Sequence, residues 1–158
     1  ITINGFSKSF SMTGWRLGYL GAPVFVAEAI SRLQDHSTSN ANSIAQKAGI
    51  AALGAPDDFY KKIRLQFQER RDYCINRLKS MPKINPVIPK GAFYIFCDIS
   101  KTGLTAVDAA NRLLDEKYLS VIPGDGFGAD DYLRISFTAS LEQLEKGMER
   151  LEEWLEKQ

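Results

Sequence analysis

The sequence predicts an α/β fold, and three observations support this expectation. Short stretches rich in β-branched and aromatic residues alternate along the chain with longer stretches whose apolar residues recur at helical spacing. Hydrophobic residues make up 44% of the 158 residues and charged residues 25%, which is ordinary for a globular protein with a core. The chain contains no internal repeat and no low-complexity tract. Strands packed against helices are the arrangement that this alternation favours.

The first third of the chain is expected to hold a polar loop between two strands, followed by two helices. The β-branched residues 1–3 indicate the end of a strand, which Asn4 and Gly5 are expected to terminate. The small polar residues over 6–14 predict a loop that depends on other parts of the protein for support. The remaining elements are a strand over 15–20 and helices over about 23–35 and about 43–53.

The segment 56–81 is the longest helical candidate. Its apolar residues fall at helical spacing, Arg and Lys occupy the other faces, and Pro82 is expected to end the helix. The residues expected to face a core are Tyr60, Ile63, Phe67, Cys74, Leu78 and Met81.

The C-terminal half is expected to contain short strands and two capped helices. Thr105 with Asp108 resembles a capping box for a helix over about 106–117, and Ser140 with Gln143 caps the last helix. The last helix presents a core stripe of Leu141, Leu144, Met148, Leu151 and Leu155. The strands are expected over 84–88, 92–99, 118–122 and 132–137.

Charge and residue types exclude several classes of function. Twenty Lys and Arg oppose nineteen Asp and Glu, so a net charge of +1 provides no field to attract nucleic acid or an anionic membrane. No apolar run is long enough to span a membrane, and no signal peptide is expected from the first residues given. Cys74 and Cys97 have no metal-ligand spacing, and His36 is the only histidine, so neither a metal site nor a Ser-His-Asp triad is expected. A reducing, cytoplasmic location fits this composition.

The loop around Lys8 is the first candidate site. Lys8 lies among Ser7, Ser9 and Ser11, and Arg16 follows eight residues later in a segment expected to be an apolar strand. Taken singly, these residues are more often a solvated lysine and an arginine paired with a carboxylate. Together they suit a different chemistry, because a lysine that bonds covalently to a carbonyl needs a nucleophilic amine and small neighbours. The arginine fork offers a phosphate bidentate hydrogen bonds that a lysine does not.

The string Ser7-Lys8, followed after five residues by Gly14-Trp15-Arg16-Leu17-Gly18-Tyr19, resembles the pyridoxal-phosphate attachment signature of the class I and II aminotransferases. These are enzymes of the aspartate aminotransferase type with fold type I. The resemblance implies pyridoxal 5'-phosphate as the cofactor and Lys8 as the catalytic lysine that holds it. It also implies that Arg16 binds the cofactor phosphate, with Ser7 as a weaker contact.

The resemblance extends along essentially the whole chain. Residues 38–46 are similar to the family's Ser-Asn turn and Gln-bearing helix, which lie near its dimer interface. Residues 89–94 are similar to the start of a small-domain strand, where the backbone of Gly91 approaches the substrate. Residues 121–124, with Phe127 and Gly128, resemble the loop before the last strand.

Arg134 is the only cation of the strand expected over 132–137. Alone, it would be taken for an arginine that points to solvent from a polar face. The resemblance implies instead that Arg134 grips the α-carboxylate of the substrate with a bidentate pair.

The resemblance also implies a domain organisation, that of the C-terminal portion of the fold type I pyridoxal-phosphate-dependent transferase fold. Residues 1–55 would end the large cofactor-binding domain and carry the cofactor lysine, 56–81 would form the interdomain helix, and 82–158 would form the small α/β domain. Complete enzymes of the family are more than twice as long. Their N-terminal half supplies a glycine-rich phosphate turn and the aspartate that pairs with the pyridine nitrogen, and neither is found here. The 158-residue chain alone is therefore expected to be inactive.

The implied function is amino-group transfer between an amino acid and a 2-oxo acid in amino acid metabolism and biosynthesis, by a cytoplasmic homodimer. A carbon–sulfur β-lyase or a cyclopropane-carboxylate synthase on the same scaffold stays an alternative, as does a non-catalytic fragment. Residues 35–37 lack the arginine with which some aspartate enzymes hold a distal carboxylate. The sequence leaves the amino acid and the 2-oxo acid open.

Overall fold

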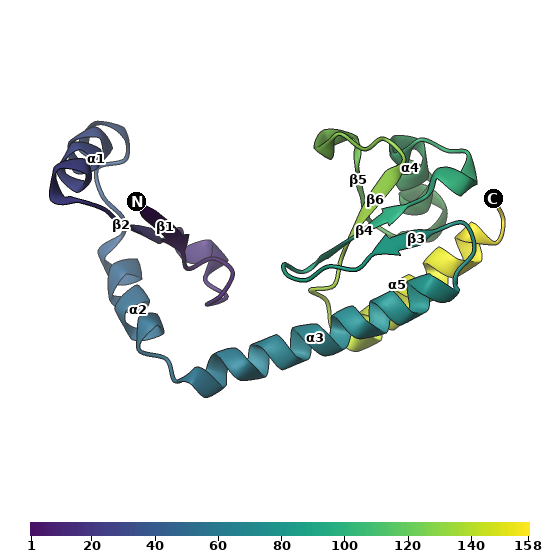
Figure 1. The fold of residues 1–158 in the computed structure, drawn as a ribbon, viewed down its shortest axis with the longest axis horizontal. Coiled ribbons are helices and arrows are strands. Elements are labelled where there is room, and N and C mark those ends of the chain that lie inside the picture. The colour runs from purple at the N-terminus through teal and green to yellow at the C-terminus, as the bar shows by residue number, and fades with distance from the viewer. The chain divides into compact units, whose positions relative to one another are not determined.

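The computed structural model describes residues 1–158, which divide into two compact units, Ile1–Lys62 and Ile63–Gln158. Each unit has its own hydrophobic core. Helix α3 (Asp57–Ser80), the long helix of Figure 1, contains residues of both units, since the division falls after Lys62. No helix combines the length and the apolar character that crossing a membrane requires.

The first unit contains a two-stranded antiparallel sheet and two helices. Strand β1 (Thr2–Gly5) pairs with β2 (Gly18–Gly21), and α1 (Val24–Ser37) and α2 (Ser43–Leu53) follow. The side chain of Asn42 caps α2 by accepting a hydrogen bond from the N–H of Ala45 at 3.0 Å. The buried hydrophobic residues of this unit are Phe6, Met12, Leu17 and Ala45, and Gly49 of α2 is buried as well.

Two expectations for the first unit are wrong. Asn4 and Gly5 belong to β1 instead of ending it, because they pair with Tyr19 and Gly18 of β2. The strand expected over 15–20 begins only at Gly18, because residues Thr13–Trp15 form a 3-10 turn. Arg16 ends that turn with a left-handed φ of 51°, so it precedes the strand instead of lying inside it.

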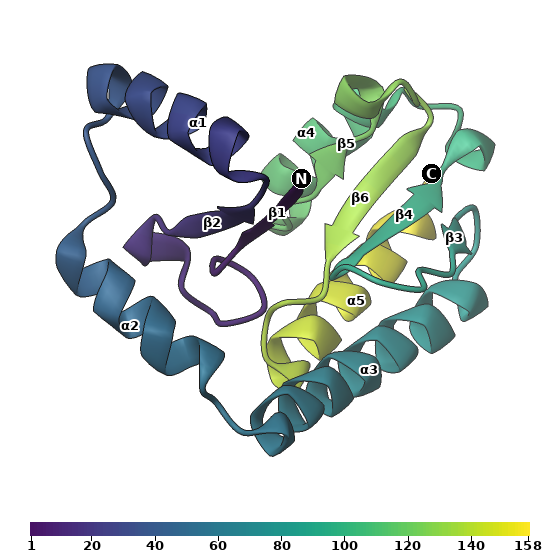
Figure 2. The ribbon, with the colours of Figure 1, turned by 60° about the vertical axis from the view of Figure 1, so that its left-hand side comes forward.

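The second unit is an antiparallel sheet with helices on one face. The strand order is β3 (Asn85–Val87), β4 (Tyr94–Asp98), β6 (Tyr132–Ser136) and β5 (Ile122–Pro123). The alternate residues Ile95, Cys97, Leu133 and Ile135 enter the core with side chains of α3, α4 (Ala106–Lys117) and α5 (Leu141–Leu155). Figure 2 shows the sheet in front of α4 and α5. The residues between these positions therefore face away from the helices.

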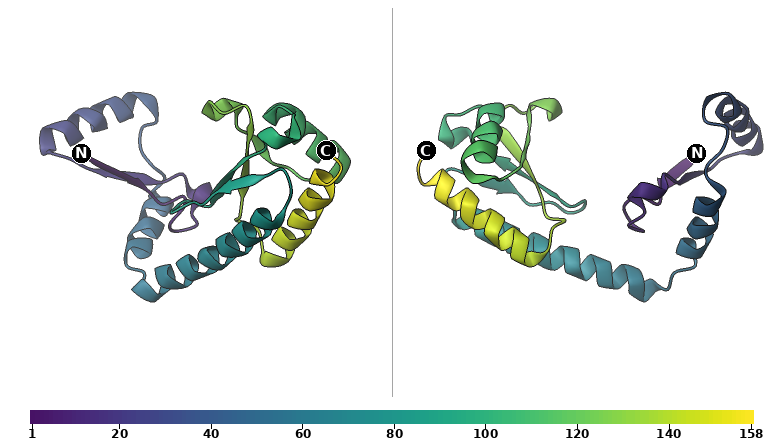
Figure 3. Two further views of the ribbon diagram at one scale, coloured as in Figure 1. Left: turned by 45° about the vertical axis from the view of Figure 1, so that its right-hand side comes forward. Right: turned by 180° about the vertical axis from the view of Figure 1, so that it is seen from behind.

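The helices of the second unit follow their sequence signals closely. The Thr105 hydroxyl accepts from the N–H of Asp108 at 3.2 Å and donates to its carboxylate at 2.8 Å, which confirms the cap of α4. Ser140 caps α5, and the expected stripe is buried except for Leu141, which is half-buried. The fully buried Trp154 joins it. Helices α3 and α5 lie side by side (Figure 3), joined by an ion pair of Arg77 and Glu152 at 2.7 Å.

The strand expected over 118–122 is largely absent. Tyr118 takes a left-handed φ of 50° and ends α4, with its N–H bonded to the carbonyl of Leu114 at 3.0 Å. The N–H of Leu119 closes a second bond, to Leu113 at 3.1 Å. Residues 118–121 are therefore a helix exit, and only Ile122 and Pro123 pair with β6. The other strands of this unit are shorter than expected by one to three residues.

Candidate functional site

The loop that carries Lys8 joins β1 to β2 and is closed by backbone hydrogen bonds. The N–H of Phe6 donates to the carbonyl of Leu17 at 3.1 Å, and that of Met12 donates to Phe6 at 3.3 Å. Within the loop, the N–H of Ser11 donates to the carbonyl of Lys8 at 3.1 Å. Lys8 therefore opens a tight turn in which Ser9 and Ser11 are small and only Phe10 is large, and the side chain of Lys8 is exposed.

Apolar anchors hold this loop on the first unit's core. Phe6 and Met12 are buried on either side of Lys8, and the rings of Phe6 and Phe10 lie 5.0 Å apart. Phe10 also meets the ring of Tyr60 edge-on at 5.6 Å. Sequence reasoning missed these anchors because it weighed the small polar residues of 6–14. The apolar residues Phe6, Phe10 and Met12, which are interspersed among these polar residues, could have indicated the anchors.

Arg16 lies at the other end of the loop with most of its hydrogen-bonding capacity unused. Its Nη1 donates to the carbonyl of Thr13 at 3.1 Å, the side chain is exposed, and it forms no ion pair. Its left-handed backbone conformation is uncommon for a residue with a Cβ atom. Residues in such conformations are enriched at functional sites. The remaining N–H groups can donate hydrogen bonds to an external anion. The loop thus brings Ser7, Lys8 and Arg16 into one structural element.

Arg134 lies on the face of the second unit's sheet that the helices leave uncovered. In the ladder it stands opposite Phe96 of β4 and Ile122 of β5. That face is aromatic, since Phe96 and Tyr132 stack with their centroids 4.8 Å apart. The polar face assumed for an isolated Arg134 is therefore wrong.

The guanidinium of Arg134 contacts aromatic rings and no carboxylate. Its Cζ lies 4.4 Å from the ring centroid of Tyr94 and 4.6 Å from that of Phe127. Its Nε is buried with no hydrogen-bond partner. The acidic residue of β4, Asp98, is engaged elsewhere: it accepts from the N–H of Ser100 at 2.8 Å, and hydrogen bonds from Ser100 lower the pKa of its carboxyl.

A cavity of about 340 Å³ surrounds Arg134. Its other walls are apolar or aromatic: Val87, Pro89, Tyr94, Phe96 and Phe127. Arg134 is the only cation in this wall, and its Nε–H group is buried without a hydrogen-bond acceptor. Such a group favours binding of an anion, which supplies the missing acceptor. A carboxylate matches the arginine fork.

Gly91 lines a different cavity of the same unit. This cavity, of about 280 Å³, also contains Arg64, Arg71 and Lys90. A Cβ atom on Gly91 would meet nothing within 4 Å, and the neighbouring Ala92 has a left-handed φ of 58°. The second unit therefore does not bring Gly91 into the cavity of Arg134.

The turn after α1 also follows the predicted pattern. The N–H groups of Thr38 and Ser39 both donate to the carbonyl of Gln34 at 2.9 Å, and the side chain of Gln46 donates to Ala41 at 2.8 Å. Asn40 and Gln46 line a cavity of about 540 Å³ with residues of the loop and sheet of the first unit.

The remaining nucleophiles are chemically quiet. Cys74 and Cys97 are free and buried, and burial raises the pKa of the Cys74 thiol to about 11 and that of Cys97 to about 12. Both therefore stay protonated near neutral pH, where the thiol is a poor nucleophile. No group of three or more His, Cys, Asp or Glu side chains is arranged to hold a metal ion.

Comparisons with known proteins identify relatives over nearly the whole chain. The family model described as aminotransferase class I and II matches residues 1–151. The aspartate aminotransferases of Pinus pinaster and Bacillus sp. (strain YM-2) are 40% and 41% identical, over 98% of this chain but only 34% and 41% of their own lengths. Among solved structures, an aromatic aminotransferase from Pyrococcus horikoshii OT3 superimposes with a TM-score of 0.92 at 38% identity. It covers 99% of this chain and 43% of that one. The aspartate aminotransferase from Rhizobium meliloti gives 0.90 at 35% identity, with 98% and 41% covered.

Proposed function

Because the chain belongs to the class I and II aminotransferases, we propose that the protein containing it moves an amino group between an amino acid and a 2-oxo acid. The chain spans about 40% of the length of most of the relatives it matches and aligns with their C-terminal part. Most of these relatives are named aspartate aminotransferases, so aspartate with 2-oxoglutarate is the first substrate pair to test.

One observation carries the proposal: the guanidinium of Arg134 forms no ion pair in a cavity whose other walls are apolar. A buried charged donor without an acceptor is energetically unfavourable unless a ligand supplies that acceptor. An α-carboxylate of an amino acid supplies the missing acceptors. Arg134 would bind and orient the substrate so that the bond from the α-carbon to its hydrogen is held for cleavage.

The residues of the Lys8 loop fit pyridoxal 5'-phosphate, the cofactor that membership of this family implies. Arg16 has unused donors for a phosphate dianion, and the half-buried Ser7 is close in sequence to add a hydroxyl. Lys8 projects from a turn with small neighbours, which leave room for a ring. The bound cofactor supplies an electron sink at the substrate's α-carbon.

Within this proposal, Lys8 is the covalent anchor of the cofactor and the group that moves a proton at the α-carbon. Arg16 holds the phosphate with Ser7 as a second contact. Gly91 lines a cavity apart from that of Arg134, so its backbone would approach a part of the substrate other than the α-carboxylate. Residues 1–55 would end the large domain, 56–81 would form the interdomain helix, and 82–158 would form the small domain.

The function is tested on the full-length protein that contains this chain. The purified protein is incubated with pyridoxal 5'-phosphate, aspartate and 2-oxoglutarate, and in parallel with a sulfur-containing amino acid. Formation of glutamate and oxaloacetate supports amino-group transfer. Release of pyruvate and ammonia from the sulfur amino acid, without glutamate formation, would assign the protein to the β-lyases instead.

We further infer a homodimer in the cytoplasm that serves amino acid biosynthesis. The Ser-Asn turn of residues 38–40 supports the dimer by its likeness to the family's interface segment. A reducing compartment suits two free, buried cysteines. Light scattering on the full-length protein measures the oligomeric state, and a monomeric mass would overturn this part.

A further inference from the structure

Phe127 is an exposed aromatic residue with a specific neighbour. It lies in the loop between β5 and β6, and 56% of its surface is accessible. A single exposed apolar side chain is normal at a protein surface and by itself carries no information. The ring of Phe127, however, lies 4.6 Å from Cζ of Arg134 and meets the ring of Phe96 edge-on at 6.2 Å.

The loop that carries Phe127 is tightly closed on itself. The N–H of Gly124 donates to the carbonyl of Tyr132 at 2.8 Å, and the carbonyl of Gly124 accepts from Phe127 at 2.8 Å and from Ala129 at 3.1 Å. Gly128, with a φ of 80°, closes the turn. A Cβ atom on Gly124 would lie 2.3 Å from the carbonyl oxygen of Ala129, so only glycine fits there. The backbone therefore fixes the point from which the Phe127 ring extends.

The rings hold the cation without consuming its hydrogen-bond donors. An aromatic face attracts a cation through its negative quadrupole, while the N–H groups of a guanidinium point outward in its own plane. A carboxylate partner in the plane of the guanidinium would instead occupy those donors. Contact with Tyr94 and Phe127 thus keeps Arg134 ordered and still able to bind an anion.

The two rings differ in the freedom of their backbones. Tyr94 belongs to β4, where the ladder with β6 fixes it beside Arg134. Phe127 reaches the same guanidinium from a loop outside the ladder. The position of the Phe127 ring beside Arg134 therefore depends on the loop conformation, whereas that of Tyr94 depends on the strand pairing.

We propose that Phe127 is a positioning residue that holds Arg134 in the orientation that binds the substrate's α-carboxylate. It acts through Arg134 and does not itself take part in the chemistry. The inference rests on the proposed function, because it assumes that the anion bound by Arg134 is the substrate carboxylate.

The test compares three variants of the full-length holoenzyme. Phe127→Leu keeps an apolar side chain but removes the ring, Phe127→Tyr restores a ring, and Gly126→Ala alters the same loop where a Cβ atom has open space. We expect Phe127→Leu to raise the KM for the amino acid by roughly fivefold to tenfold with kcat changed by less than about twofold. Phe127→Tyr and Gly126→Ala should stay within about twofold of the unmodified enzyme in both constants. An unchanged KM in Phe127→Leu, or a loss of bound cofactor with it, would overturn the proposal.

A binding measurement separates this proposal from the proposed function. Calorimetry with succinate measures the affinity of the holoenzyme for a carboxylate and does not depend on turnover. Phe127→Leu should weaken succinate binding in the presence of Arg134 and have no further effect in the Arg134→Leu background. Additive losses in the double variant would show that Phe127 does not act through Arg134. Absence of amino transfer with this non-additive pattern would refute only the proposed function.

Discussion

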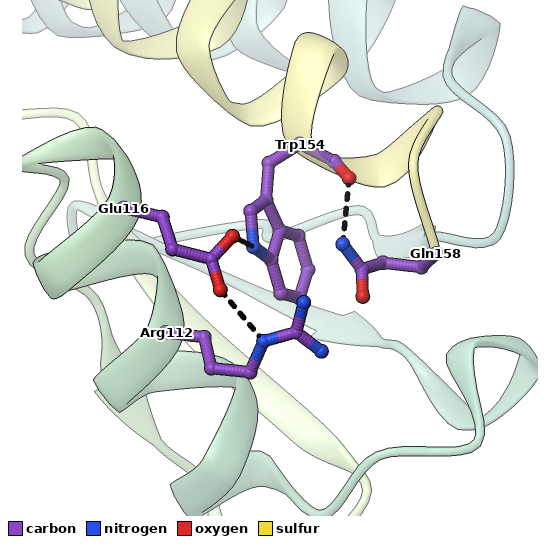
Figure 4. Close-up of polar contacts among 4 residues, drawn as sticks. All are labelled: Arg112, Glu116, Trp154 and Gln158. Atoms are coloured by element: carbon purple, nitrogen blue, oxygen red, sulfur yellow. Dashed lines mark hydrogen bonds and ion pairs between the residues drawn. The ribbon is translucent and has the colours of Figure 1, made fainter.

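The indole N–H of Trp154 donates a hydrogen bond to Oε2 of Glu116 at 3.1 Å and so joins α5 to α4 (Figure 4). The other carboxylate oxygen of Glu116 accepts from Nε of Arg112 at 2.8 Å, and that guanidinium lies 5.5 Å from the Trp154 ring. The side chain of Gln158 donates to the carbonyl of Trp154 at 2.9 Å. Glu116 therefore bonds to a fully buried indole and an arginine at once, at the edge of the core.

The first prediction concerns the acid stability of this contact. The hydrogen bond from Arg112 holds the pKa of Glu116 below its ordinary value of 4.5, in opposition to desolvation. Because the pKa is lower in the folded state, the contribution of Glu116 is fully present above 4.5 and is lost as the pH falls through the lowered value. In urea unfolding, the stability advantage over Glu116→Gln should be constant near neutral pH and shrink below about pH 4.5. An advantage that persists unchanged to pH 2 would contradict this.

The second prediction concerns the closed loop between β5 and β6. Gly124→Ala places a Cβ atom 2.3 Å and 2.7 Å from the backbone carbonyl oxygens of Ala129 and Tyr132, which cannot move without opening the turn. We expect a loss of about 3 kcal/mol in the free energy of unfolding, at the upper end of overpacking effects. Gly126→Ala is the matched control, since its Cβ atom meets nothing within 4 Å. Equal stabilities of the two variants would contradict the assigned loop geometry.

Local signals predicted the helices well because the caps that start them are contained in a few neighbouring residues. The box of Thr105 and Asp108 fixed the start of α4. The end of α4 at Lys117 was predicted as well, but the residues after it were wrongly predicted to form a strand, because Tyr118 and Leu119 have the aromatic and branched character of one. The left-handed turn at Tyr118 was decided by backbone bonds to Leu113 and Leu114, which composition does not reveal.

The candidate site could be predicted only where its residues are close in sequence. The family resemblance based on the Lys8 motif is confirmed by the match over residues 1–151. The turn that places Arg16 before β2 was not foreseen, because an apolar run around a single arginine is typical of a strand. The aromatic surroundings of Arg134 come from Tyr94 and Phe127, which the ladder and the loop bring together across many residues. No local pattern specifies such contacts.

The third prediction assigns the cofactor lysine. In the full-length enzyme, Lys8→Ala should abolish the visible absorbance of the lysine-bound cofactor and nearly all turnover, because no other lysine lies in the loop. Borohydride reduction followed by peptide mapping should place the label on Lys8. Lys61→Ala is the control variant and should retain both properties. A label on Lys61 or Lys90 would refute the assignment.

The fourth prediction separates the two arginines. Arg134→Leu should lower kcat/KM for the amino acid while the cofactor stays bound. The expected decrease corresponds to a loss of about 3–5 kcal/mol of transition-state stabilisation. Arg16→Leu should instead weaken cofactor retention, because it removes a cation from the phosphate. Equilibrium dialysis of the cofactor and steady-state kinetics distinguish the two losses. Identical defects in both variants, or an unchanged kcat/KM in Arg134→Leu, would show that the roles are wrongly divided.

The last prediction concerns the 158-residue chain alone, which should be inert in amino transfer even with added cofactor. Its first unit has a core of only four buried hydrophobic residues and a two-stranded sheet, and an isolated sheet of that size is marginal in water. Side chains such as Ile1, Ile3 and Phe25 are more than 70% exposed, so the open sheet edges and apolar surface favour association with another chain.

The second unit should fold, because its sheet has a helix-covered core of its own. Hydrogen exchange should therefore protect β4 and β6 while β1 and β2 exchange quickly, and light scattering should detect oligomers. Cofactor titration and amino-transfer assays on the same sample complete the test. Turnover together with stoichiometric cofactor binding would show that these 158 residues hold a complete site, which the proposed division of the site between this chain and the rest of the enzyme does not allow.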